Sequence, residues 1–297
     1  MSLIGAVEAG GTKFVLALAR SDGGVLARTR LDTRHPDETL RDMAEWFASA
    51  AQDHGAIGAF GIASFGPIDI DPASPTFGTF TTTPKPGWSG ARYHDALKRF
   101  RVPLAIDTDV NGAALGEQMA GAGRGKRTVA YTTIGTGIGT GVVTAGQTLG
   151  GVSHYESGHI RPARPPGDDW PGHCPFHGDC LEGLASGPAI MARWGHDLSQ
   201  ASTEHIALVA DYLSEFAMTL ALLHMPDVMI FGGGVVKAPG LLDALRAKTR
   251  HKLAGYAKHY DRDLTGIIVP PALGDDAGIT GAIALGRQRL ESATARK

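Results

Sequence analysis

The chain of 297 residues has little cysteine, little net charge and no long apolar segment. Its two cysteines, Cys174 and Cys180, are too few for a disulfide framework. A formal net charge of −2 gives no electrostatic reason to expect nucleic acid or an anionic membrane surface as a partner. No apolar run approaches the roughly 20 residues that span a bilayer. The N-terminus also lacks the basic start and long apolar core of a signal peptide. We therefore expect a cytoplasmic protein with no membrane and no nucleic-acid partner.

Glycine, in contrast, is abundant. The 41 glycines exceed the usual share of about 7% and gather in short loops, which indicates backbone that comes close to a ligand. A strand–glycine–strand pattern begins near residue 3 and again near residue 127, and buried strands and helices follow each one. The two halves form a weak internal repeat. Strands that alternate with helices predict an α/β fold with largely parallel central sheets.

Apolar residues at helical spacing predict a helix after Pro36, from Leu40 to Ala51, with Asp37 as its cap. The stretch 151–181, rich in Gly, Pro and His, fits neither half, and we interpret it as an inserted loop. Further strands are expected over 56–69, 103–109, 227–233 and 266–270, and further helices from 111 and over 203–224, 240–254 and 277–291.

The first glycine motif is "EAGGTK", residues 8–13. Gly10 and Gly11 can turn the backbone sharply and point N–H groups at a phosphate. Thr12 and Lys13 would add a hydroxyl and a positive charge. The alternative is a tight hairpin that binds nothing, because Gly-Gly is a common hairpin turn.

Two further glycine motifs follow. "TIGTGIGTG", residues 133–141, has glycine at every second position, which makes a poor ordinary strand and favours close approach of a ligand over a simple bend. "FGGGVV", residues 231–236, follows an apolar strand, where open α/β sheets bind nucleotides. Three such loops in one chain favour nucleotide binding more than any one of them alone.

The segment "DTDVNGAALGE" places Asp109 between a predicted strand and a predicted helix. A carboxylate there can accept the proton of a substrate hydroxyl that attacks a phosphorus atom. The alternative is that Asp107 or Asp109 only caps the helix.

The segment "HCPFHGDC" has the spacing Cys-x2-His-x2-Cys. With His159 upstream, Cys174, His177 and Cys180 provide the four ligands that a tetrahedral structural zinc requires. In a reducing compartment such spacing indicates a metal more readily than a disulfide. Zinc would order a loop that has little apolar content of its own.

Other readings of this segment stay open. Cys174 and Cys180 could form a disulfide, or the loop could bind no metal. His173 and His154 are rival candidates for the fourth ligand.

Together and in this order, these stretches resemble the ROK family of sugar kinases. The most specific part is "ESGHIRP", then "HCPFHGDCLEGLASGPA", "FGGGVV" and "LGDDAGITGA". The resemblance covers nearly the whole chain and implies the actin-like ATPase (ribonuclease H-like) fold. Two lobes, each a mixed sheet flanked by helices, would surround a cleft, with ATP on the larger lobe and a hexose between them.

On this basis residues 1–109 would form the small lobe, with the C-terminal helix 277–297 packed back on it. Residues 110–276 would form the large lobe, including a zinc-binding insert at about 151–182.

The resemblance also implies roles for individual residues. Asp109 matches the catalytic base. The residues expected at ATP are Gly10, Gly11, Thr12, Lys13, Thr133, Gly135, Thr136, Gly137, Pro188, Gly232, Gly233, Gly234 and Val235. Those expected at the sugar are Gly66, Pro67, Thr108, Asp109, Glu156, His159 and Glu182. The expected ligands of a structural Zn²⁺ are His159, Cys174, His177 and Cys180, and Mg²⁺ would accompany ATP.

Two departures point to one branch of the family. The first loop usually begins with Asp, and here it begins with Glu8; glucokinases carry C-x-C-G-x-x-G-C where this chain has C-x2-H-x2-C. Both features resemble the fructokinase branch, as does "EAGGTKF". Thr108 also replaces the Asn of the glucokinase Asn-Asp pair. The resemblance predicts an ATP-dependent fructokinase that makes fructose 6-phosphate and, as a family expectation, a homodimer.

Three alternatives are kept. Another hexose kinase would act on mannose or glucose. A sugar-responsive repressor would carry an N-terminal helix-turn-helix segment, for which a phosphate loop that starts at residue 8 leaves no room. A filament or chaperone ATPase could share the fold.

Overall fold

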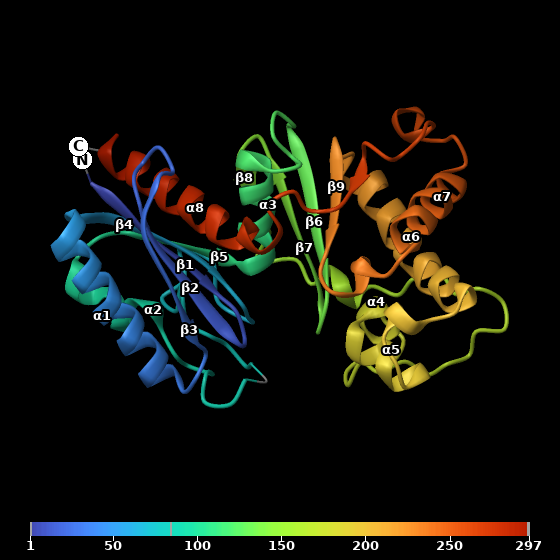
Figure 1. Cartoon of the computed structure of the whole chain (residues 1–297), viewed down its shortest axis with the longest axis horizontal. Helices are drawn as coiled ribbons and strands as arrows, with labels where there is room; N and C mark the ends of the chain where they lie inside the picture. The colour runs from blue at the N-terminus through green and yellow to red at the C-terminus, as the bar shows by residue number, and fades with distance from the viewer. Residues whose placement is uncertain (1, 84, 296–297) are drawn as a thin grey trace. The chain divides into compact units, whose positions relative to one another are not determined.

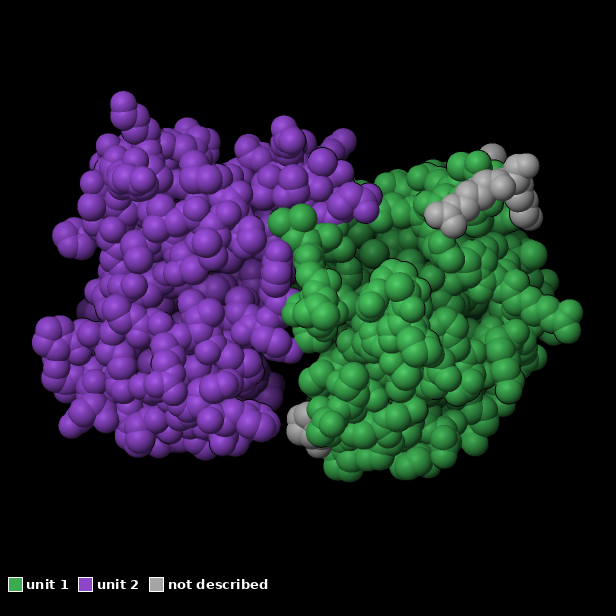
Figure 2. All heavy atoms as spheres, turned by 180° about the vertical axis from the view of Figure 1, so that it is seen from behind, with its two compact units in different colours: residues 1–120, 148–154, 275–297 green, residues 121–147, 155–274 purple. Residues whose placement is uncertain are grey.

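The computed structural model describes residues 2–83 and 85–295. Residue contacts divide the chain into two compact units, coloured separately in Figure 2. Unit 1 comprises residues 1–120, 148–154 and 275–297, and unit 2 comprises residues 121–147 and 155–274. The first boundary lies after Ala120 and not at residue 109, because the helix that follows Thr108 packs on elements of unit 1.

Unit 1 is built on a mixed five-stranded sheet in the order β3-β2-β1-β4-β5. The first three strands form an antiparallel meander, whereas β4 and β5 run parallel to β1. The expectation of largely parallel sheets is therefore only half right, because the tight glycine turn after β1 forces β2 to run back. The strands are β1 (Leu3–Ala9), β2 (Lys13–Ala19), β3 (Val25–Asp32), β4 (Ile57–Ser64) and β5 (Leu104–Thr108).

Helices cover both faces of this sheet (Figure 1). Helix α1 (Pro36–His54) and the short α2 (Tyr93–Leu97) contribute to an aromatic core with Phe14, Phe47 and Phe60. Helix α8 (Ala277–Thr294) covers the other face, where small residues of β1 and β2 meet Ile279. Side chains of a strand point alternately to the two faces of a sheet, so a strand that is apolar on both sides needs a helix layer on each face.

Helix α1 corrects one detail of the sequence analysis. It begins at Pro36, with His35 at the N-cap position, so Asp37 lies in the first turn and does not cap the helix. Proline is favoured as the first helical residue because its missing N–H would have no partner there. Asp37 still faces the positive end of the helix dipole.

Helix α3 (Asp109–Ala120) crosses α8 at very short range because glycines line the contact. A Cβ at Gly281 would lie 1.7 Å from the carbonyl oxygen of Gly112, and a Cβ at Gly116 would lie 2.2 Å from that of Ala277. A methyl group fits at neither position. The bare backbones therefore bring the N-terminal turns of both helices to the carboxyl end of β1.

Unit 2 has a second five-stranded sheet in the order β10-β9-β6-β7-β8. β6 pairs antiparallel with β7 and parallel with β9, and β9 pairs parallel with β10. The predicted strand–glycine–strand repeat is thus found at the centre of each sheet. The strands are β6 (Thr128–Ile134), β7 (Ile138–Thr144), β8 (Gln147–Thr148), β9 (Val228–Gly232) and β10 (Ile268–Val269).

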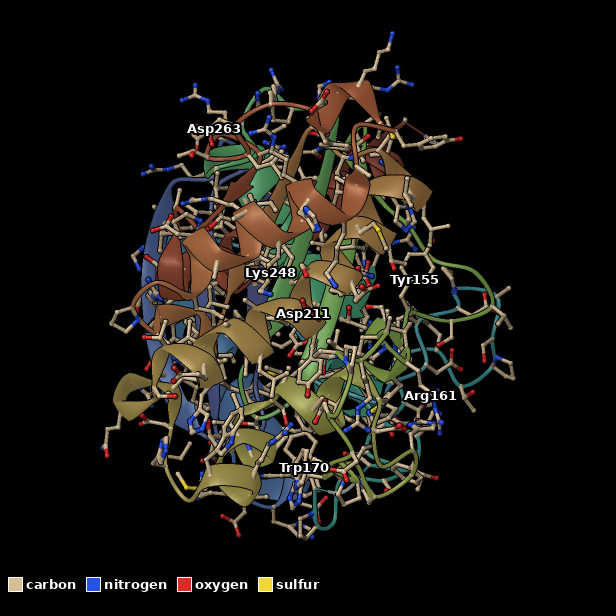
Figure 3. The ribbon with its side chains drawn as sticks, turned by 90° about the vertical axis from the view of Figure 1, so that its right-hand side faces the viewer. Tyr155, Arg161, Trp170, Asp211, Lys248 and Asp263 are labelled. Carbon is tan, nitrogen blue, oxygen red and sulfur yellow. The ribbon has the colours of Figure 1, made fainter. Side chains whose placement is uncertain are left out.

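Helices α6 (Thr203–His224) and α7 (Leu241–Leu253) pack against each other in unit 2. Asp211 of α6 and Lys248 of α7, labelled in Figure 3, are 3.1 Å apart. Among the described residues, α6 alone is long and apolar enough to cross a membrane, and 56% of its most apolar window is buried inside the protein. Its hydrophobicity is that of a core helix.

Candidate active site

The first glycine loop joins β1 to β2 in unit 1. The Gly10 amide donates to the Lys13 carbonyl at 2.8 Å, which closes the turn, and the Thr33 hydroxyl donates to the Gly10 carbonyl at 2.7 Å. Gly11 and Thr12 remain exposed at the tip. The loop is held at its base and open at its tip, as an anion-binding turn requires.

Lys85 adds a cation to this loop that the sequence analysis did not identify. Its Nζ donates to the carbonyl oxygens of Gly11 and Thr33. An ammonium group has three donors, and among the described residues two of them are used here. The surrounding "TPKPG" gave no signal, because a single lysine between prolines is typical of an exposed turn.

Glu8 is the last residue but one of β1 and lies on the face that α8 covers. Burial raises the pKa of Glu8 to about 7; Lys13 opposes the rise and the neighbouring charge of Asp109 adds to it. Its Oε2 is buried and has no hydrogen-bond partner among the residues that the structure describes. Gly278, at the start of α8, makes room for the carboxyl group, since a Cβ there would lie 2.6 Å from its carbon. An unpartnered buried carboxylate oxygen is suited to a cation.

Asp109 is the first residue of α3 and is exposed. The Thr108 hydroxyl accepts the Asn111 amide at 3.2 Å, so Thr108 provides the helix cap. Asp107 is buried and accepts the side-chain amide of Asn111 at 2.6 Å. The capping alternative for the two aspartates is therefore wrong, although Asp109 does accept the amide of its neighbour Val110 at 2.9 Å.

The predicted sugar-side loop, Gly66 and Pro67, follows β4 in the same unit. The Thr83 hydroxyl donates to the Gly66 carbonyl at 3.2 Å, and the Thr81 amide donates to the Pro67 carbonyl at 2.9 Å. Both loop residues are half-buried. Unit 1 thus brings together the first glycine loop, Glu8, Asp109 and this loop at the carboxyl ends of β1, β4 and β5.

The other two glycine loops lie in unit 2. The Gly187 amide donates to the Gly135 carbonyl at 2.8 Å, which joins the second loop to the start of helix α5 (Gly187–Trp194). Gly233 has a φ of 91°, and a Cβ there would lie 2.2 Å from the Ile134 carbonyl oxygen. Only glycine allows the third loop to approach the second so closely.

These loops line a pocket of about 390 Å³ in unit 2. The predicted residues in its wall are Gly135, Thr136, Pro188, Gly234 and Val235. Thr133, Gly137, Gly232 and Gly233 are not wall residues, and they belong to the strand ends and turns behind it. The wall also contains residues that sequence reasoning missed, namely Gly187, Ile190, Asp197, Leu198, Ser199, Lys237 and Ala238.

The missed residues give the pocket its chemical character. Ile190, Leu198 and Ala238 are buried and apolar, which suits the face of a planar base. Asp197, Ser199 and Lys237 are exposed and polar. No motif connects the missed residues, because they come from helix α5 and two separate 3-10 turns that only the fold assembles.

Glu182 lies in helix α4 (Leu181–Ala185) and braces the second glycine loop. Its Oε2 accepts the Ile138 amide at 2.9 Å and would lie 2.8 Å from a Cβ at Gly137. The sequence analysis expected Glu182 at the sugar. The structure places it two residues after the last cysteine of the insert, in direct contact with the loop, so it links the insert to that loop.

The predicted metal ligands converge. The Nδ1 atom of His159 is 3.8 Å from the Cys174 sulfur and 3.5 Å from the Cys180 sulfur, and His177 Nδ1 is 3.6 Å from the Cys174 sulfur. All four ligand atoms lie within 4.8 Å of one another. Zinc bonds of about 2.1 Å to nitrogen and 2.3 Å to sulfur, at the tetrahedral angle, separate such atoms by about 3.6 Å. The donor set therefore fits zinc.

The backbone around these ligands is built for a tight turn. Cys174 and Gly178 exchange two backbone hydrogen bonds, at 3.1 and 2.9 Å, and both cysteines are free thiols. A Cβ at Gly172 or Gly183 would lie within about 2 Å of the Gly178 carbonyl oxygen, at 2.1 and 1.9 Å respectively. His173 is exposed and lies outside the four-residue cluster, as does His154.

The model of the ROK family matches residues 4–289. The chain belongs to the ROK family. It is 44% identical over 290 residues to a fructokinase of Zymomonas mobilis, a match that covers 95% of this chain and 96% of that one. The crystal structure of a ROK hexokinase from Thermus thermophilus matches it with a TM-score of 0.79 and 25% identity, over 98% of this chain and 99% of that one.

A third match is the ROK family glucokinase of Streptomyces griseus in complex with glucose and AMPPNP. It has a TM-score of 0.65 and 25% identity, over 97% of this chain and 100% of that one. These three relatives are sugar kinases by name, and the two crystal structures have the expected two-sheet α/β fold.

Proposed function

We propose that this ROK protein is an ATP-dependent fructokinase that phosphorylates fructose at O6. The observation that carries the proposal is the 44% identity, over nearly the full length of both chains, to a protein named as a fructokinase. The site supports it, because an exposed carboxylate, Asp109, lies in the same unit as a glycine loop with two lysines and a buried acid.

In this mechanism Asp109 accepts the proton of the sugar 6-hydroxyl. The oxygen forms a bond to the γ-phosphorus of ATP, the bond from that phosphorus to the bridging oxygen breaks, and ADP leaves with that electron pair. Asp109 suits the role because Thr108 takes over the capping of α3. The Thr108 hydroxyl accepts a hydrogen bond from the helix. Thr108 stays a predicted sugar-site residue because it directly precedes Asp109.

The adenine base fits the unit 2 pocket, against Ile190, Leu198 and Val235, where amides of the second and third glycine loops are close at hand. The tip of the first loop, with Lys13 and Lys85, is suited to the transferred phosphoryl group. When bound, Mg²⁺ neutralises phosphate charge, and Glu8 Oε2 with Asp109 would hold it.

The four-residue cluster would hold a structural zinc, because its ligands are two thiols and two imidazoles with no open position needed for chemistry. Glu156 and His159, which lie in one short segment of unit 2, stay predicted sugar-binding residues. Free thiols fit the cytoplasm as the location. The homodimer stays a prediction, which sedimentation measures directly.

The test compares Asp109→Asn with Asp53→Asn, a control on the exposed side of α1. We expect Asp109→Asn to lower kcat for fructose by about 10²- to 10⁴-fold. Fructose binding should change by less than about threefold, because the amide keeps the shape of the carboxyl group. Near-normal turnover in Asp109→Asn would show that another residue is the base.

Rates with fructose, mannose, glucose and N-acetylmannosamine, measured side by side, test the substrate. Fructose should have the highest kcat/KM. A higher value for mannose or glucose would assign another hexose kinase, and binding without turnover of any sugar would assign a regulator.

A further inference from the structure

The segment 148–154 belongs to unit 1, although the residues on both sides of it belong to unit 2 (Figure 2). It is fastened to the turn that carries the proposed base. The Thr148 hydroxyl donates to Asp107 Oδ2 at 2.7 Å. Asp107 Oδ1 accepts the Thr108 amide at 2.7 Å and the Asn111 side chain at 2.6 Å. One buried carboxylate thus ties this segment to the start of α3.

His154 is the last residue of this segment and lies against the predicted sugar-side loop. Its Nε2 is 4.0 Å from the position of a Cβ on Gly66. It is also close enough to Asp107 to lower the pKa of that carboxyl group, which burial raises. Two independent neighbours therefore place the imidazole between the turn that carries Asp109 and the loop that carries Gly66 and Pro67.

His154 has no role in the mechanism proposed above. The sequence analysis considered it only as a rival zinc ligand, and the cluster of described residues is complete with His159, Cys174, His177 and Cys180. His154 is only partly buried, so its ring can reach a ligand.

We propose that His154 is a sugar-binding residue that acts from unit 1 and helps to determine which hexose is accepted. The inference rests on the proposed sugar-kinase function. An imidazole nitrogen either donates or accepts a hydrogen bond, and a sugar hydroxyl can do both. The ligand chemistry is that of a hexose hydroxyl close to Gly66. Sites that use such bonds discriminate strongly between sugars, because the wrong isomer leaves a polar group unpaired.

The test uses His154→Ala, His154→Gln and the control His173→Ala, whose side chain is exposed in the metal-binding insert. Kinetics with fructose and mannose give KM and kcat for each sugar, and calorimetric titration gives fructose affinity without turnover. Zinc content and thermal unfolding are measured on the same preparations. Glutamine can place an amide nitrogen near the position of Nε2, so it serves as the rescue variant.

We expect His154→Ala to raise the KM for fructose by about 10- to 100-fold and to change the fructose-to-mannose ratio of kcat/KM by about 10-fold. The KM for ATP, the zinc content and the melting temperature should match the wild type. His154→Gln should recover part of the fructose affinity, and His173→Ala should change none of these values.

Three results would overturn the inference. The first is an unchanged fructose affinity in His154→Ala. The second is the loss of zinc, which would make His154 a metal ligand. The third is an equal loss for both sugars and ATP together with a lower melting temperature in both variants. A wild-type protein that binds fructose but transfers no phosphoryl group would refute only the proposed function, because the calorimetric comparison would still test His154.

Discussion

Glu8 shows how burial changes the chemistry of a single carboxyl group. Its pKa in the folded protein is about 7, mainly because of burial, against 4.5 as the ordinary value. The folded chain therefore holds a proton on Glu8 between these two values, where the unfolded chain does not. The resulting stability is fully present below pH 4.5 and is lost as the pH rises through 7.

Replacement of Glu8 by glutamine should remove this pH dependence. We expect Glu8→Gln to be more stable than the wild type at pH 8 by about 1–3 kcal/mol, and to lose that advantage at pH 4.5. Thermal unfolding without added magnesium, at a series of pH values, measures the difference. Glu45→Gln, on the exposed side of α1, should follow the wild type throughout. A Glu8→Gln curve parallel to that of the wild type would mean that Glu8 ionises as freely as a surface carboxyl.

The sequence predicted many single site residues and missed others for a definite reason. Asp109 and the four predicted metal ligands lie in short motifs whose spacing is itself the signal. Lys85, Ile190 and Leu198 have no local pattern, because their importance comes from contacts with segments far away in the chain.

At the scale of elements, the insert between β8 and α4 contains the proposed metal site. Residues 160–180 contain no helix or strand, and Cys174 and Cys180 are among their few buried side chains. Arg161 and Trp170, on the face shown in Figure 3, belong to this irregular stretch. Such a segment has too little apolar surface to order itself, so a bound metal would supply the folding free energy.

Removal of the metal should therefore act locally. We expect a strong chelator, or Cys174→Ser, to remove one zinc per chain and to make residues 154–182 sensitive to protease. The second glycine loop should loosen as well, because Glu182 at the end of the insert accepts the Ile138 amide. Metal analysis and mapping of the first cleavage sites measure this, with His173→Ala as the control. A metal-free chain that stays protected in 154–182 would contradict it.

The site also depends on the close crossing of helices α3 and α8. Gly281→Ala would put a methyl carbon 1.7 Å from the Gly112 carbonyl oxygen, so one of the helices must move. We expect a loss of about 2–3 kcal/mol in unfolding free energy and lower activity, because Asp109 and Glu8 lie at the ends of this crossing.

Gly266→Ala is the matched control, since a Cβ there meets no atom within 4 Å and the position is exposed. Denaturant unfolding of both variants measures the difference in their free energies of unfolding. Equal stability of the two alanine variants would show that the crossing can widen at no cost.

Elements with strong periodicity were well predicted. The range 203–224 was expected as a helix and is α6, because apolar residues recur along its whole length and Ser202 accepts the His205 amide as a cap. The Asp37 cap was wrong, because Pro36 already fixes the start of α1. The antiparallel start of each sheet agrees with the expected strand–glycine–strand pattern and mixed sheets. The apolar pattern of a buried strand carries no direction by itself, so the expectation of largely parallel sheets held only for the later strands.

At the scale of the whole molecule, chain order and spatial order differ. The chain passes between the units after residues 120, 147, 154 and 274. Unit 1 is therefore assembled from three segments, and the last is mostly α8. Local sequence signals predicted where α8 begins, but the glycine contacts that join it to α3 are evident only in the fold.

A chain that ends at Gly274 tests how far unit 1 depends on its last segment. Without α8, one face of the first sheet loses Ile279, Ala282 and Ile283, which cover small residues of β1, β2 and β4. Helix α3 still packs on β4, where Gly112 meets Ala63, but the apolar residues of β1 and β2 on this face lose the cover of α8. Strands on this face should therefore lose protection from hydrogen exchange. We expect rapid exchange in residues 3–19 and 57–64 and no kinase activity. A chain that ends at Ala295 keeps all of α8 and should behave as the full protein does. If the shorter chain retained slow exchange in β1 and β4, those strands would be stabilised by α1 and α3 without α8, and the close helix crossing would position Asp109 without holding the sheet together.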